Sequence, residues 1–113
     1  MKTAIIGSRN FTDYKLLKEY CSKFDITEVI SGGARGADSL AENYAKENNI
    51  KLTVFPADWK KFGKSAGFIR NKDIIDNADF VIAFWDGESK GTLNSINIAK
   101  SQNKKVDICF IVS

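Results

Sequence analysis

The chain has 113 residues, 43% of them hydrophobic and 12% aromatic, and a net charge of +3, which predicts one folded domain over residues 1–113. Histidine is absent and the two cysteines, Cys21 and Cys109, stand far apart, which excludes Ser-His-Asp or Cys-His catalysis, a zinc site and a disulfide framework. We therefore expect reduced thiols in a cytoplasmic protein that binds no metal and no membrane, and the weak positive charge argues against nucleic acid as a partner.

Apolar segments typical of strands alternate with amphipathic segments typical of helices along the chain. In chain order, strands are expected at residues 2–7, 27–31, 51–55, 80–85 and 106–112. Helices are expected at residues 16–24 after an N-cap at Thr12 or Asp13, at 37–48, at 65–77 and at 92–102, with a loop at 57–63.

Strict alternation of five strands and four helices predicts an α/β fold with a parallel sheet and right-handed crossovers. The order 3-2-1-4-5 places two helices on each face, and 2-1-3-4-5 is the alternative. In either order the sheet reverses direction next to the first strand, and ligands bind beyond the carboxyl ends of the strands at such a reversal.

Three loops at that edge are rich in glycine and hydroxyl side chains: residues 7–10 (GSRN), 31–38 (SGGARGAD) and 86–92 (DGESKGT). Glycine lets backbone N–H groups approach an anion, and a following helix adds its dipole. Any one loop fits a tight strand-to-helix turn equally well, but the three together indicate a cradle for phosphate and sugar. The dinucleotide pattern GxGxxG is absent, and residues 58–65 end in GKS without the first glycine of a P-loop.

The helix expected at 65–77 opens with Gly67 and carries Arg70 one turn later, near the strand ends. A solvated arginine is the alternative interpretation. Three aromatic residues nearby, Trp59, Phe62 and Phe68, can stack on a base, but we expect them to pack on the core.

Read in order, GSR at 7–9, SGGARGAD at 31–38, AGxxRN at 66–71, AD at 78–79 and GT at 91–92 resemble the YspA-like branch of the SLOG superfamily. That superfamily also holds the LOG phosphoribohydrolases and the DNA-processing proteins DprA/Smf. The resemblance covers residues 3 to about 106 and implies a Rossmann-like three-layer sandwich. It also implies binding of a nucleotide-derived ligand such as a nucleoside phosphate, NAD or an ADP-ribose-type molecule. The residues assigned to ligand binding are Gly7, Ser8, Arg9, Ser31, Gly32, Gly33, Arg35, Gly36, Asp38, Gly67, Arg70, Asn71, Gly91 and Thr92.

One departure bears on activity. LOG enzymes carry a catalytic glutamate three residues after the late Gly-Thr, where this chain has Ser95. Asp38 and Asp86 are the carboxylates left as catalytic candidates. The main hypothesis is therefore a nucleotide-ligand sensor or carrier. A hydrolase of a similar ligand and DprA-like single-stranded DNA binding are the alternatives. A homodimer is also predicted, because no helix follows the last strand to cover its edge.

Overall fold

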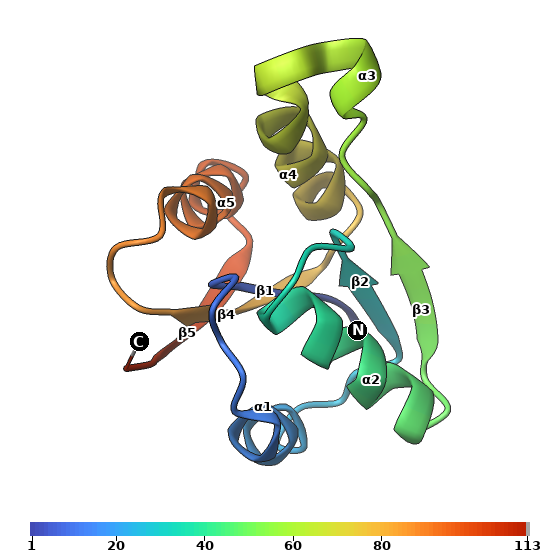
Figure 1. Cartoon of the computed structure of the whole chain (residues 1–113). Helices are drawn as coiled ribbons and strands as arrows, with labels where there is room; N and C mark the ends of the chain where they lie inside the picture. Colours follow the sequence, from blue (N-terminus) through green and yellow to red (C-terminus); the bar gives the residue numbers. More distant parts are fainter. Residues whose placement is uncertain (113) are drawn as a thin grey trace.

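Five parallel strands form one sheet in the order β3-β2-β1-β4-β5, which confirms the predicted order and excludes 2-1-3-4-5 (Figure 1). The structure is a computed structural model that describes residues 1–112. The strands are β1 (Lys2–Gly7), β2 (Glu28–Ser31), β3 (Lys51–Val54), β4 (Phe80–Trp85) and β5 (Lys105–Phe110). The carboxyl ends of β1, β2 and β4 therefore lie at one edge, where the three glycine-rich loops begin.

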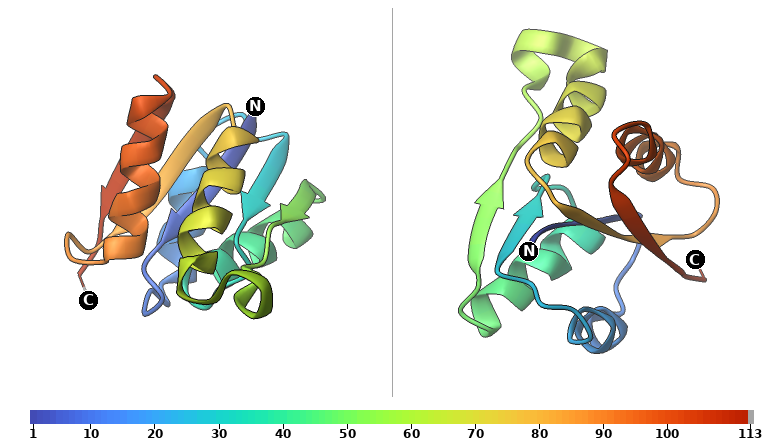
Figure 2. Two further views of the ribbon diagram at one scale, coloured as in Figure 1. Left: turned by 90° about the horizontal axis from the view of Figure 1, so that it is seen from above. Right: turned by 180° about the vertical axis from the view of Figure 1, so that it is seen from behind.

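The predicted helices are present: α1 (Tyr14–Cys21), α2 (Ala37–Glu47), α4 (Ala66–Asp76) and α5 (Lys90–Ser101). Helices α1 and α2 cover one face of the sheet, and α4 and α5 cover the other (Figures 1 and 2). Asp13 is the N-cap of α1, since its carboxylate accepts a hydrogen bond of 3.1 Å from the backbone N–H of Leu16. The first helix ends earlier than expected, at Cys21, and the last begins earlier, at Lys90.

The expectation of a loop without regular structure at 57–63 is wrong. The segment contains a short helix, α3 (Trp59–Phe62), followed by a 3₁₀ turn, η1 (Gly63–Ser65). The Asp58 carboxylate starts α3 by accepting a hydrogen bond of 3.1 Å from the N–H of Lys61. This N-cap was visible in the sequence, but a four-residue helix is too short to show a hydrophobic period.

The sheet separates two apolar cores because side chains alternate along each strand. On the α1 and α2 side, Ile5 and Phe84 meet Leu17, and Phe84 stacks on Phe11 with ring centroids 5.2 Å apart. On the other side, alternate strand residues meet α4 and α5. The central strands β1 and β4 are buried on both faces, as their apolar sequences predict. Within residues 1–112, no helix is long and apolar enough to cross a membrane.

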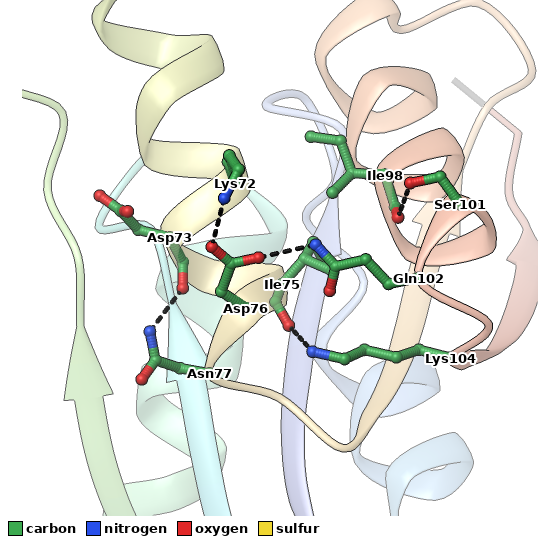
Figure 3. Close-up of polar contacts among 9 residues, drawn as sticks. All are labelled: Lys72, Asp73, Ile75, Asp76, Asn77, Ile98, Ser101, Gln102 and Lys104. Carbon is green, nitrogen blue, oxygen red and sulfur yellow. Dashed lines mark hydrogen bonds and ion pairs between the residues drawn. The ribbon is translucent and has the colours of Figure 1, made fainter.

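Polar contacts join the carboxyl ends of α4 and α5, which lie side by side (Figure 3). The Asp76 carboxylate accepts hydrogen bonds from Lys72 Nζ (2.7 Å) and Gln102 Nε2 (2.6 Å), and these two donors, Lys72 first, lower its pKa. The Lys104 ammonium donates to the backbone carbonyl of Ile75. These contacts lie at the end of the helices remote from the glycine-rich loops, so they orient α4 and α5 without occupying the loop edge.

Candidate functional site

The three loops and the amino ends of α2, α4 and α5 surround a cavity of about 490 Å³, here called the main cavity. That volume is within the roughly 300–1,000 Å³ of small-molecule sites. The described lining residues are Ile6, Gly7, Ser8, Arg9, Asn10, Ala34, Asp38, Trp59, Lys64, Gly67, Phe68, Arg70, Asn71, Ile74, Asp86, Glu88, Ser89, Gly91, Thr92 and Ser95.

A second cavity of about 430 Å³, here called the arginine pocket, lies beside the first. It is lined by Arg9, Gly32, Gly33, Ala34, Arg35, Pro56, Ala57, Trp59 and Arg70. Four of these residues also line the main cavity: Arg9, Ala34, Trp59 and Arg70. The two cavities therefore adjoin across shared side chains.

The sequence-assigned residues divide between these cavities. The main cavity includes Gly7, Ser8, Arg9, Asp38, Gly67, Arg70, Asn71, Gly91, Thr92 and the candidate acid Asp86. Gly32, Gly33 and Arg35 line only the arginine pocket. Ser31 and Gly36 line neither. Their contacts are structural: the Ser31 hydroxyl donates to Glu42 (3.1 Å), and a Cβ on Gly36 would lie 2.4 Å from the Ser8 and Arg9 carbonyl oxygens.

Ser8 presents an unusual hydroxyl. The residue is only 4% exposed and lines the main cavity, yet its Oγ has no hydrogen-bond partner among residues 1–112. The Asp86 carboxylate lies beside it, but the pair does not reach hydrogen-bond geometry. Asp86 instead accepts from the N–H groups of Ser89 (2.8 Å) and Glu88 (2.9 Å), which lower its pKa. A buried polar group without a partner is costly, so Ser8 suits an oxygen of a bound ligand.

Asp38 is a buried carboxyl group on the wall of the main cavity. It stands in the first turn of α2, is 8% exposed, and burial raises its pKa to about 6. The N–H of Ala34, at 3.1 Å from Oδ2, acts against this shift, as do Arg70 and Arg9. A strongly shifted carboxyl group in a cavity is typical of a functional residue.

Arg70 and Asn71 tie α4 to two of the loops. Arg70 Nη1 donates to the Gly32 carbonyl (2.8 Å), and its Nε donates to Asn71 Oδ1 (3.1 Å). Asn71 Nδ2 donates in turn to Asn94 Oδ1 (3.1 Å) and to the Gly91 carbonyl (3.4 Å). Sequence analysis missed Asn94, which lies outside both cavities and acts through Asn71.

The expectation that the nearby aromatic residues pack on the core is wrong. Trp59 is 53% exposed and Phe68 57% exposed, and both line the main cavity, whereas the exposed Phe62 lies outside both cavities. The short helix α3 places Trp59 over the start of α4. A Cβ on Gly67 would lie 3.5 Å from the Trp59 ring. Lys64 is exposed and also borders the main cavity.

Two solved structures share the fold. DNA processing protein A (DprA) from Streptococcus pneumoniae superposes with a TM-score of 0.76 at 20% identity, over 95% of this chain and 49% of that one. DprA from Helicobacter pylori superposes with a TM-score of 0.64 at 23% identity, over 96% of this chain and 64% of that one. The chain therefore spans about half to two thirds of these proteins.

The expectation that the weak net charge argues against nucleic acid as a partner is wrong. The Helicobacter pylori structure describes how that protein binds single-stranded DNA, so this fold is compatible with a nucleic-acid ligand. The error came from using net charge. A net charge of +3 averages over the whole surface, whereas Arg9, Arg35 and Arg70 concentrate positive charge at one pocket.

Sequence comparisons agree with the motifs. The Gene 61 protein of Mycobacterium phage D29 is 37% identical over an alignment of 78 residues, which covers 64% of this chain and 62% of that protein. The model of the YspA, cpYpsA-related SLOG family matches residues 1–62, which include the first two glycine-rich loops. As the motifs implied, the chain belongs to the YspA, cpYpsA-related SLOG family.

Proposed function

We propose that the main cavity binds a nucleotide or nucleotide-derived ligand, as a sensor or carrier. The observation that carries the proposal is the Ser8 hydroxyl, which is buried at the cavity wall without a partner. The surroundings fit the same class of ligand. Trp59 and Phe68 offer exposed rings beside the cavity, and Arg9 and Arg70 offer positive charge.

Binding is favoured over hydrolysis because both candidate carboxylates already accept hydrogen bonds from the backbone. Asp86 is held by two backbone N–H groups of its own loop, and Asp38 accepts from the N–H of Ala34. Ser95 lies in the cavity wall at the place where LOG enzymes carry glutamate. The carboxylates present thus have structural partners, and a serine occupies the position of the catalytic glutamate of LOG enzymes.

The Ser8→Ala variant tests the proposal. Because the hydroxyl has no partner, the variant should match the wild type in free energy of unfolding within about 0.5 kcal/mol. Its affinity for the ligand should fall roughly 3- to 10-fold, the value of one hydrogen bond. The measurement is a thermal-shift panel of AMP, ADP, ATP, NAD and ADP-ribose, followed by calorimetric titration. A ligand at a hundredfold excess over its Kd adds about 2.7 kcal/mol of stability.

Ser101→Ala is the matched control, since Ser101 lies at the far end of α5 and donates to the Ile98 carbonyl at 2.7 Å (Figure 3). It should bind ligand as the wild type does. The proposal fails if no nucleotide stabilises the wild-type protein. It also fails if Ser8→Ala loses stability but keeps its affinity.

Single-stranded DNA is a second candidate ligand, favoured by the Helicobacter pylori structure and by the exposed Trp59 beside the arginine pocket. Binding of a short oligonucleotide, followed by fluorescence anisotropy, should weaken steeply with salt. Trp59→Ala should weaken it by about 1–3 kcal/mol through lost base stacking. Phe62→Ala, which removes an exposed ring outside both cavities, should leave it unchanged. Binding that does not respond to salt would exclude this candidate.

A further inference from the structure

The two edges of the sheet, β3 and β5, differ in how well they are protected from pairing with another strand (Figure 1). Strand β3 has only four residues, its Lys51 pairs with Glu28, and Pro56 follows two residues after the strand ends. Short strands, lysines and prolines are features that block edge-to-edge association. Strand β5 has six residues, as many as the central strands β1 and β4, with no proline or glycine among them. The β5 edge is therefore the one that can accept a further strand.

The register of β5 shows which of its backbone groups have no strand beside them within residues 1–112. Strand β5 pairs with β4, and beyond the strand the N–H of Ile111 donates to the Trp85 carbonyl at 2.9 Å. Backbone groups point alternately to the two sides of a strand, so those of Val106, Ile108 and Phe110 point away from β4. No other strand of the described chain lies on that side. This edge also carries exposed apolar surface, since Phe110 is 69% exposed.

Two opposite charges, Lys105 and Asp107, lie at the β5 edge on the same face of the sheet. The Asp107 carboxylate accepts a hydrogen bond from the Tyr20 hydroxyl of α1. The Lys105 ammonium lies over the ring of Phe80, 5.7 Å from its centroid, in the core on the α1 side. Tyr20 contacts only Oδ1 of the carboxylate, and neither charge takes part in a salt bridge of the described residues. Both side chains can therefore take an ion-pair partner from another chain.

We propose that two copies of the chain associate through their β5 edges, antiparallel about a two-fold axis at Val106, so that one sheet extends across both copies. In this register Val106 lies opposite Val106 of the second copy, and Lys105 of each copy lies opposite Asp107 of the other. The two-fold symmetry forms both ion pairs at once. Opposite residues on one face of an antiparallel pair have Cβ atoms about 4.5–5.5 Å apart, which suits a contact between lysine and aspartate. The charges of the edge are thus complementary to those of a second copy.

Charge also distinguishes this register from its neighbours. An axis at Asp107 would place two carboxylates opposite each other, and like charges directly opposite destabilise a sheet. An axis at Ile108 or Cys109 would place Asp107 opposite an uncharged residue, Cys109 or Ile111, which leaves its charge without an ion-pair partner. The axis at Val106 is the one of these four that pairs the charges. The proposed dimer is independent of the proposed function, because no residue of β5 is among the described lining residues of either cavity.

Sedimentation equilibrium of the full chain over a range of concentrations tests the dimer, and the wild type should reach twice the 12.6 kDa mass of the chain. Lys105→Glu and Asp107→Lys each place like charges opposite each other, so each should weaken dimerisation about tenfold or more. An equimolar mixture of these two variants has opposite charges at both positions and should associate more tightly than either variant alone. Lys46→Glu is the matched control, because it makes the same charge change on the exposed surface of α2. It should change the Kd of the dimer by less than about twofold.

Amide hydrogen exchange of the wild type gives a second readout. The N–H of Val106 should exchange more slowly as the protein concentration rises, because it bonds the second copy. The N–H of Leu52, which points outward from the opposite edge at β3, should exchange at a constant rate.

Three results would overturn the proposal. The first is a wild type that stays at the mass of one chain at every concentration. The second is equal dimerisation of Lys105→Glu and Lys46→Glu. The third is a mixture of Lys105→Glu with folded Asp107→Lys that associates no more tightly than the single variants. Concentration-dependent protection of Leu52 in place of Val106 would assign the interface to β3 and would also contradict it.

Discussion

Gly36→Ala is expected to destabilise the protein by about 3 kcal/mol. Gly36 has φ +74° and ψ −126°, a conformation that is strained for any residue with a side chain. A Cβ there would also lie 2.4 Å from the carbonyl oxygens of Ser8 and Arg9. Backbone strain and steric overlap each cost roughly 1–3 kcal/mol. Urea-induced unfolding followed by circular dichroism measures the difference.

Alanine variants of two other glycines distinguish the cost of backbone strain from the cost of steric overlap. Gly87 has φ +83° with open space around it, so Gly87→Ala carries the conformational cost alone, about 1–2 kcal/mol. Gly91 lies in α5 with neither restriction, and Gly91→Ala should leave stability unchanged or raise it by up to about 1 kcal/mol. If Gly36→Ala costs no more than Gly87→Ala, the close approach at Gly36 does not constrain the fold.

The approach at Gly36 matters because it positions the site. The N–H of Ala37 donates to the Ser8 carbonyl at 3.2 Å, so the loop after β1 is fixed against the start of α2. Gly7 has a related role, since a Cβ there would meet the Phe84 carbonyl oxygen at 2.4 Å. Gly7 and Gly36, both assigned to the ligand, thus hold the first loop in place. This position of the loop keeps the Ser8 hydroxyl buried at the cavity wall.

The parallel sheet could be predicted because strand and helix patterns alternate along the chain, and because β4 is a continuous apolar run whose ends predict its bounds at 80–85. The loops of the site could be predicted from their glycines and from the position that parallel strands impose. The arginine pocket could not, because Arg35 and Arg70 are far apart in the sequence and meet only through packing. The exposure of Trp59 was missed for the same reason, since α3 lifts it over Gly67.

Asp38→Asn is expected to stabilise the protein at pH 7.5 by about 2–3 kcal/mol. Burial raises the pKa of Asp38 to about 6, well above the usual value of an aspartate, so ionising this carboxyl group is costlier in the folded state. Its favourable contribution is complete below about pH 4 and is lost as the pH rises through about 6. The wild type should therefore lose this stability between pH 4 and 6, and Asp38→Asn should not. Asparagine can still accept from the N–H of Ala34.

Asp73→Asn on the exposed surface of α4 is the control, and it should change the free energy of unfolding at pH 7.5 by less than about 0.5 kcal/mol. Equal stabilities of Asp38→Asn and wild type at pH 7.5 would show that Arg70 and Arg9 neutralise the carboxylate fully.

A residue that costs stability and lines a cavity is typical of functional sites, where activity is retained at the expense of the fold. Asp38→Asn should accordingly bind nucleotide less tightly than the wild type while unfolding at higher denaturant. An increase in both stability and affinity would mean that the carboxylate opposes the ligand's phosphate and does not contact its sugar.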